Sequence, residues 1–163
     1  MAPDADAAAD RAHRAELAIR RTLAEYCQLL DDGRFDQWIE VFSEDVAYAV
    51  MGRVTRGRAE LRQLIEPLQQ AEARGRHVLS EPLIIVDGDH AAATTDYCFV
   101  SQDLKVTSAG RYHDVLVDDG RRWRIVAREV VFLGAEPQGI PGIPGGPGGP
   151  GGPGGPEHGE APA

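Results

Sequence analysis

The sequence predicts an α+β domain, in which three N-terminal helices pack on a strongly curved antiparallel sheet and enclose a cone-shaped interior. Two observations lead to this fold class. Between residues 14 and 70, apolar residues recur with the spacing of helical faces, and after Gly75 the pattern changes to that of strands separated by turns. Helices followed by hairpin-connected strands are typical of α+β folds.

The helical part consists of three segments. The first helix is predicted to end at Gly33, a residue that commonly terminates helices. Its apolar face comprises Ile19, Leu23, Tyr26, Cys27 and Leu30. A shorter helix over residues 35–42 leads into a strand over residues 46–50. The third helix follows Gly57 and is expected to kink at Pro67; its apolar face comprises Leu61, Leu64, Ile65 and Leu68.

The remainder of the domain is predicted to be a four-stranded antiparallel meander. Its expected strands cover residues 76–86, 90–101, 109–117 and 122–133. Gly-containing turns, Asp87-Gly88-Asp89 and Asp118-Asp119-Gly120, join the strands into two hairpins. Proline lacks the N–H that a central strand needs, so Pro82 is expected at a sheet edge or a bulge.

The chain is expected to form one domain over residues 14–134, between a flexible N-terminus (1–13) and a disordered, Gly/Pro-rich tail (135–163). From Gly139 the tail reads as Gly-x-Pro triplets, the register of collagen. Most of these triplets carry a second glycine, which favours a solvated tail over a triple helix. A triple helix stays an alternative if the folded body is a trimer.

Composition excludes several classes of function. The net charge is −9 and no basic stripe is present, which argues against a nucleic-acid partner or an anionic membrane surface. No long apolar run and no signal-peptide pattern occur, so the chain is expected neither to span a membrane nor to be secreted. Cys27 and Cys98 match no ligand spacing and fit unpaired core thiols in a reducing cytoplasm.

No cofactor or metal is expected from the motifs. The histidines and cysteines lack metal-ligand spacing, and the sequence contains neither a phosphate-binding Gly-rich loop nor a Gly-x-Ser-x-Gly elbow.

Asp31 is the first candidate catalytic residue. It follows Cys27 by four positions, which places it on the inward face of the first helix. Burial and the negative end of the helix dipole would both raise the pKa of a carboxyl group there, unless a cation or donor lies near. If the helix ends one residue earlier, Asp31 is instead a solvated residue of an Asp-Asp-Gly turn. Both interpretations stay open at this point.

His77 is the second candidate, at the start of the first long strand. Strand alternation does not decide whether it faces inward, because both Leu79 and Glu81 share its parity. Paired with an aspartate in an apolar cavity, a histidine is a general base, because the carboxylate fixes its tautomer and stabilises the imidazolium.

Three further residues are candidates for substrate binding. Tyr26 and Tyr48 lie on elements expected to line the cone, where each is either a hydrogen-bond donor to a substrate or a core ring. Arg128 has apolar neighbours of the same parity, so it is either a cation in the pocket or turned outward by a bulge near Ala127. His113 shares its side of a strand with Arg111, which suggests a solvated face without excluding the cavity.

The order of these motifs resembles the SnoaL-like branch of the nuclear-transport-factor-2-like superfamily. The resemblance covers residues 14 to about 134 and rests on residues 26–36, on Gly75-Arg76-His77 with residues 85–91, and on residues 109–113 with 120–126. It implies a cone-shaped fold and, as in relatives, homodimers or homotrimers formed through the sheet.

Within that superfamily the pattern is similar to scytalone dehydratase, hexachlorocyclohexane dehydrochlorinase and bile-acid 7α-dehydratase. The resemblance implies that Asp31 and His77 abstract a carbon-bound proton, with Tyr26 and Tyr48 holding the substrate or the leaving group. A cofactor-independent lyase or isomerase acting on a hydrophobic small molecule is therefore the leading hypothesis. The alternatives are a polyketide cyclase and a non-catalytic ligand-binding or subunit-interaction module of the same fold.

Overall fold

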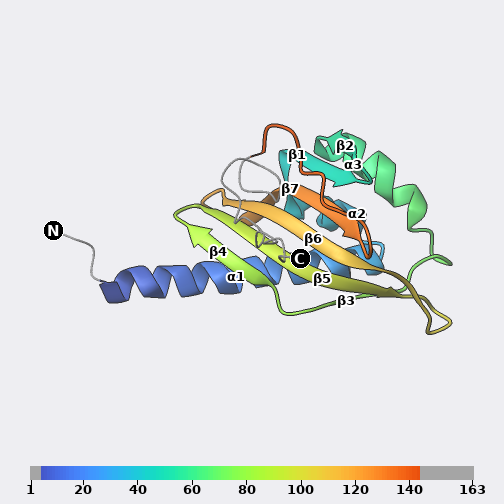
Figure 1. Cartoon of the computed structure of the whole chain (residues 1–163), viewed down its shortest axis with the longest axis horizontal. Helices are drawn as coiled ribbons and strands as arrows, with labels where there is room; N and C mark the ends of the chain where they lie inside the picture. The colour runs from blue at the N-terminus through green and yellow to red at the C-terminus, as the bar shows by residue number, and fades with distance from the viewer. Residues whose placement is uncertain (1–4, 144–163) are drawn as a thin grey trace, which may run out of the picture.

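The computed structural model describes residues 5–143, and its first element, helix α1 (Ala5–Asp31), is much longer than the apolar pattern indicated. Residues 5–13, expected to be a flexible N-terminus, form helical turns that extend beyond the sheet (Figure 1). They are rich in alanine, the strongest helix former, and continue a helix that is already nucleated. No helix in this described range is long and apolar enough to cross a membrane.

Helix α1 ends in a Schellman motif centred on Gly33. The N–H of Gly33 donates to the Leu30 carbonyl (3.0 Å), and the N–H of Arg34 donates to the Leu29 carbonyl (2.8 Å). Gly33 has a φ of 70°, which a residue with a side chain rarely adopts. This cap keeps Asp31 inside the helix, so the open question about Asp31 is answered in favour of the helical position.

Between α1 and the meander lie two short helices and a hairpin. Helix α2 (Phe35–Trp38) continues as the 3₁₀ turn η1 (Ile39–Val41), which leads into strand β1 (Phe42–Val50). A tight turn at Met51 and Gly52 joins β1 to β2 (Arg53–Arg56), a strand that the sequence analysis missed. Helix α3 (Arg58–Ile65) then gives way to the 3₁₀ turn η2 (Glu66–Leu68) at Pro67, where a kink was expected.

The expected meander is present, but its first strand is split in two. Strands β3 (Arg76–Leu79) and β4 (Leu83–Asp87) are separated at Pro82, and both pair with β5 (His90–Val100). Strands β6 (Val106–Asp118) and β7 (Trp123–Phe132) complete the meander. Pro82 therefore lies in a break at the edge of the sheet, where its missing N–H breaks no ladder.

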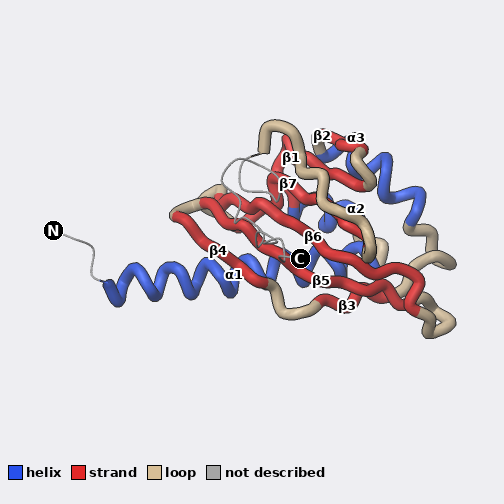
Figure 2. The backbone as a smooth tube through the Cα atoms, viewed as in Figure 1, coloured by secondary structure: helices blue, strands red, loops and turns tan. Residues whose placement is uncertain are grey.

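The seven strands form one curved sheet, with the order β2-β1-β7-β6-β5-β3 and β4 alongside β5. The α+β class is confirmed, with one correction, because β1 pairs with β7 in parallel and the sheet is therefore mixed. Figure 2 shows α2 and the second half of α1 behind this sheet, while α3 lies beside its β1–β2 edge.

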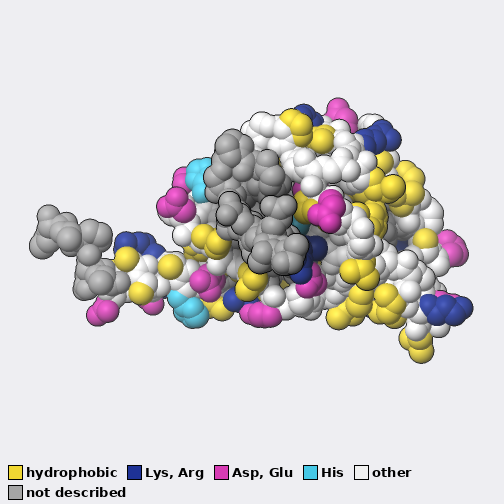
Figure 3. Space-filling model, in the orientation of Figure 1, with side chains coloured by type: hydrophobic (Ala, Val, Ile, Leu, Met, Phe, Trp, Pro, Cys, Tyr) yellow, Lys and Arg dark blue, Asp and Glu magenta, His cyan; other side chains and the backbone are white. Residues whose placement is uncertain are grey.

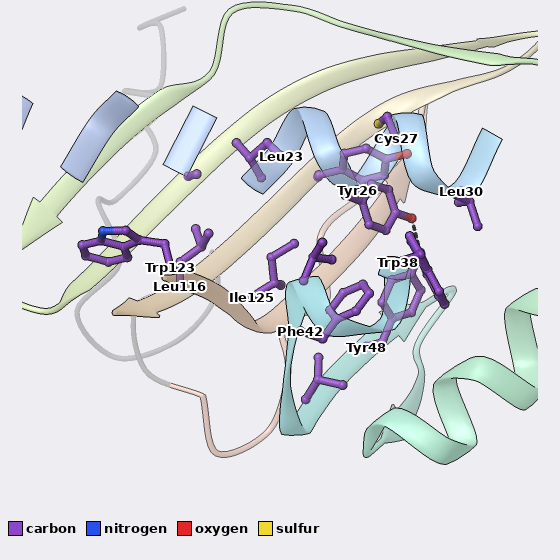
Figure 4. Packing of buried hydrophobic residues seen from close by; sticks show 14 of the residues in the cluster. Leu23, Tyr26, Cys27, Leu30, Trp38, Phe42, Tyr48, Leu116, Trp123 and Ile125 are labelled. Carbon is purple, nitrogen blue, oxygen red and sulfur yellow. Dashed lines mark hydrogen bonds between the residues drawn. The ribbon is translucent and has the colours of Figure 1, made fainter. Parts of the chain in front are cut away.

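The hydrophobic core fills the space between α1 and the sheet. Leu23, Tyr26 and Leu30 of α1 pack with Trp38 and with residues from β1, β6 and β7 (Figure 4). The Tyr26 ring contacts both Trp38 (centroids 6.0 Å apart) and Phe42 (5.8 Å).

The segment after β7 packs against the sheet, although residues 135–163 were expected to be a disordered tail. Glu129 Oε1 accepts hydrogen bonds from the N–H groups of Gln138 (2.7 Å) and Gly139 (3.0 Å). Arg56 Nη2 donates to the Pro141 carbonyl (3.0 Å). A buried carboxylate thus fixes residues 135–143 in place, whereas the expectation for residues 144–163, including most collagen-like triplets, lies outside the described range.

Candidate active site

The main cavity lies between the helices and the sheet and has a volume of about 550 Å³. Its walls are largely apolar and aromatic, and they come from α1, α3, β1 and the strands of the meander. Met51 and Leu68 line it and are also exposed to solvent (79 % and 64 %), so they mark its mouth. A hollow of this size and lining suits a small hydrophobic molecule.

Asp31 and His77 meet at the wall of this cavity. His77 Nδ1 lies 2.6 Å from Asp31 Oδ1, and the backbone N–H of His77 donates to Asp31 Oδ2 (2.8 Å). Both side chains are largely enclosed, with exposed fractions of 3 % for Asp31 and 10 % for His77. The carboxylate accepts from Nδ1–H, so Nε2 is the nitrogen available to a ligand, and among residues 5–143 it has no hydrogen-bond partner.

Two glycines let the chain bring these residues together. Gly33 caps α1 directly after Asp31 and Asp32, as described above. Gly75 precedes β3 and lies so close to β5 that a Cβ there would be 2.1 Å from the Val100 carbonyl oxygen. The neighbouring residues form a second, outer pair, because Arg76 Nη1 donates to Asp32 Oδ1 (3.1 Å) on the exposed side. Asp31 and His77 therefore pair in the interior, while their chain neighbours Asp32 and Arg76 pair on the exposed side.

Tyr26 and Tyr48 also line the cavity, and their hydroxyl oxygens lie 3.3 Å apart (Figure 4). Burial raises the pKa of both phenols well above the usual value, so both stay protonated at neutral pH. One hydroxyl donates to the other, which leaves one proton free for a bound ligand. The pair can therefore act as a hydrogen-bond donor.

Aromatic side chains of the sheet form an aromatic wall of the cavity that the sequence analysis did not single out. Tyr97 and Tyr112 stack with centroids 4.3 Å apart and an interplanar angle of 4°, and Phe99 lies 4.9 Å from the His77 ring. All three rings line the cavity. Side chains alternate along β5 and β6, but the sequence did not show which side of each strand faces the interior.

Arg128 does not line the cavity, which corrects its assignment to substrate binding. Its side chain is 1 % exposed and makes a bidentate ion pair with Asp114 (2.6 and 2.8 Å) on the neighbouring strand. Its guanidinium carbon lies 3.9 Å from the Tyr26 ring centroid and 4.2 Å from that of Tyr112. Arg128 thus lies behind the tyrosines that a ligand would touch. An irregularity in the β6–β7 register, opposite Val115 and Leu116, turns it inward rather than outward.

His113 belongs to the other face of the sheet and does not line the main cavity. It is half-buried there among Asp96 and Arg111, and burial lowers its pKa. His113 thus shares a face with Arg111 away from the main cavity, but it is half-buried rather than solvated as the sequence suggested.

The potential ligands for a metal are dispersed. Among residues 5–143, no group of three or more histidine, cysteine, aspartate and glutamate side chains is arranged to hold an ion. Cys27 and Cys98 are free thiols, and burial raises the pKa of Cys27 to about 12.

The family model for the SnoaL-like domain matches residues 11–129. No curated protein matches the chain significantly.

Among solved structures, Rv3472 of Mycobacterium tuberculosis, of unknown function, shares 29 % identity, with 76 % of this chain and 75 % of that one covered and a TM-score of 0.70. A nuclear-transport-factor-2-like protein with a cystatin-like fold from Novosphingobium aromaticivorans shares 27 % identity (83 % and 94 % covered, TM-score 0.72). A protein of the same organism, provisionally named a scytalone dehydratase, shares 18 % identity (81 % and 93 % covered, TM-score 0.69), a likeness of fold alone.

Proposed function

Because this chain belongs to the SnoaL-like domain family, we propose that it is a cofactor-independent lyase or isomerase that abstracts a carbon-bound proton from a hydrophobic small molecule. His77 is the base and Asp31 orients it. The contact between Asp31 Oδ1 and His77 Nδ1 (2.6 Å) at the wall of an apolar cavity carries the proposal.

The proton moves to Nε2 of His77. Asp31 receives both the ring N–H and the backbone N–H of His77, so the imidazole is held in one tautomer and one orientation. As Nε2 takes the proton, the ring becomes an imidazolium, and the adjacent carboxylate stabilises the new charge. The low polarity of the surrounding wall strengthens this interaction, since few competing dipoles lie nearby.

Tyr26 and Tyr48 supply the electrophilic half of the reaction. Loss of a proton next to a carbonyl group places negative charge on its oxygen, and the free phenolic proton of this pair can donate to that oxygen or to a departing hydroxide. Burial raises the pKa of the Tyr26 phenol, and the Arg128 cation behind the ring opposes part of that rise.

A catalytic role explains the pair better than a ligand-binding module does. A module that only holds an apolar ligand has no need of a buried Asp-His pair with one nitrogen directed to the cavity, and an isolated His77 would have served it equally. A polyketide cyclase would use the same base and is the alternative reaction. A structural relative carries the provisional name scytalone dehydratase, which agrees with the class of reaction.

The test measures proton abstraction directly. The protein is incubated in D₂O with 2-tetralone, a bicyclic ketone with acidic methylene protons, and exchange is followed by NMR. We expect His77→Ala to reduce the enzyme-dependent exchange rate by about 10²- to 10⁴-fold, and Asp31→Asn to reduce it substantially. His113→Ala is the matched control, because His113 is a half-buried histidine outside the main cavity. Equal exchange by the wild type and His77→Ala would remove the assignment.

A further inference from the structure

One permanently charged side chain, that of Arg53, lines the main cavity. The lining also contains His77, but its ring is already hydrogen-bonded to Asp31. Arg53 is exposed and lies with Met51 at the mouth, whereas His77 lies at the enclosed wall. The cavity therefore has a basic group at its open end and the proposed base in its interior.

Arg53 also differs from most arginines of this chain in having no partner. Within residues 5–143, Arg58, Arg62 and Arg124 each bind one or more carboxylates, and Arg128 is enclosed with Asp114. The side chain of Arg53 makes no hydrogen bond or ion pair with any residue in this range. In a chain with a net charge of −9, a cation left unpaired at a cavity mouth is available to an anion from outside.

The local backbone fixes the position of Arg53. Met51 (φ 50°) and Gly52 (φ 76°) both have positive φ, as in the two-residue turns that match the twist of a β-hairpin. This turn makes Arg53 the direct cross-strand partner of Val50, and both side chains line the cavity. A positive φ is energetically unfavourable for methionine. The turn nevertheless has this conformation, and it places Arg53 beside the opening.

The rest of the lining indicates the shape of the anion. The stacked pair Tyr97–Tyr112 and the ring of Phe99 supply aromatic surface to the lining, and Figure 3 shows further hydrophobic side chains gathered toward the end of the molecule that carries α3 and the β5–β6 turn. We propose that the substrate is an apolar, ring-containing organic anion, whose rings pack against this aromatic wall and whose acidic group pairs with Arg53 at the mouth. This inference rests on the proposed function, since it names the substrate class of the same cavity.

Pairing with Arg53 requires a ligand group of a particular charge and shape. A guanidinium offers a planar fork of donors that matches a carboxylate or a sulfonate, and charge-assisted hydrogen bonds are stronger than neutral ones. Arg53 should therefore favour an anionic ligand over a neutral ligand of the same shape. Ring burial, by contrast, should be the same for both ligands.

The experiment uses a matched pair of fluorescent probes, 1-anilinonaphthalene-8-sulfonate and its uncharged parent N-phenyl-1-naphthylamine. Binding of each is titrated with the folded wild type, with Arg53→Gln and with Arg121→Gln. Arg121 is the control, because its side chain has no partner in the described range and lies outside the main cavity, while its replacement removes the same charge. We expect Arg53→Gln to weaken the sulfonate probe about tenfold and to leave the neutral probe unchanged.

Several results would overturn the inference: no binding of the sulfonate probe to the wild type, equal loss of both probes in Arg53→Gln, or the same loss in Arg121→Gln. Binding of both probes is also measured with His77→Ala. Because these titrations involve no proton transfer, a failure of the base assignment in the exchange assay leaves the probe comparison intact, and the two ideas can fail separately.

Discussion

Arg128 and Asp114 form a bidentate ion pair that is almost completely enclosed, with side-chain exposures of 1 % and 0 %. The two residues lie directly opposite each other on neighbouring antiparallel strands. The guanidinium is also in contact with the faces of Tyr26 and Tyr112. This pair therefore supports the tyrosines of the candidate site from behind, without contacting a ligand.

Removing one member of this pair is expected to be severe. Arg128→Met leaves the Asp114 carboxylate buried without a cation, which should lower the free energy of unfolding by about 3–5 kcal/mol. Urea denaturation followed by tryptophan fluorescence measures the change. The double variant Arg128→Met with Asp114→Leu should recover much of the loss, because no unpaired charge is left. A loss in the double variant equal to the sum of the two single losses would show that the ion pair is not the source.

The tyrosines provide a test of burial through pH. Burial raises the pKa of Tyr26, Tyr48 and Tyr112 above the usual value of 10, and Tyr97 is shifted in the same direction. The folded protein should therefore show little tyrosinate absorbance at 295 nm at pH 10, where the protein in denaturant is about half ionised. Substantial ionisation of the native protein at this pH would contradict the enclosed geometry.

The same shifts predict alkaline instability. Above pH 10 the unfolded chain releases phenolic protons that the folded chain retains, so the unfolded state binds fewer protons and the free energy of unfolding falls as the pH rises. Each enclosed tyrosine contributes about 1.4 kcal/mol per pH unit in that range. The contribution is fully present below pH 10, and urea titrations between pH 8 and pH 11 should show the decline begin near pH 10.

The outer face of the sheet is expected to hold the chains of a homodimer or homotrimer together. Leu83 (77 % exposed) and Ile85 (64 %) are cross-strand partners of Thr94 and Ala92, on the side of β4 and β5 away from the core. Leu83→Glu with Ile85→Glu should convert such an oligomer to monomers, because charges would then face each other across the interface. Light scattering after gel filtration measures the mass, and a wild type that is already monomeric would contradict the expectation.

Local patterns predicted much of the fold, whereas relations between distant segments were harder to see. The apolar face of α1 placed Asp31 inward, because helical spacing is written in neighbouring residues. The parallel pairing of β1 with β7 joins strands far apart in the chain, and nothing in either strand specifies its partner. The assignment of Arg128 to substrate binding was wrong for the same reason. Its burial depends on the ion pair with Asp114, and the sequence does not give the β6–β7 register that places the two residues opposite each other.

The same difference between local patterns and contacts of distant segments applies to the candidate site. His77 could be linked to Asp31 only through the resemblance to a family, because the parity of its strand was ambiguous. Its actual direction depends on the close approach of Gly75 to β5, a contact between segments that the sequence does not place together. The aromatic wall was missed because Tyr97 and Tyr112 stack across two strands whose facing sides were unknown.

Glu129 provides the last prediction, because it fixes the segment that follows β7. Its Oε1 atom accepts from the N–H groups of Gln138 and Gly139, while its buried Oε2 atom has no partner within the described residues. Glu129→Ala removes the two hydrogen bonds and also a poorly satisfied buried oxygen, so the global free energy of unfolding should change little. The local effect should be larger: amide hydrogen exchange at Gln138 and Gly139 should accelerate about tenfold or more.

The control for this experiment is Glu136→Ala, since Glu136 lies in the same segment, is exposed and makes no hydrogen bond or ion pair with another described residue. The Arg56 bond to the Pro141 carbonyl depends on the same placement of the segment, so hydrogen exchange beyond Pro141, at Gly142 and Ile143, should accelerate in Glu129→Ala but not in the control. Unchanged exchange in Glu129→Ala would mean that contacts other than the carboxylate, such as Gln138 against Gly52, hold the segment on the sheet.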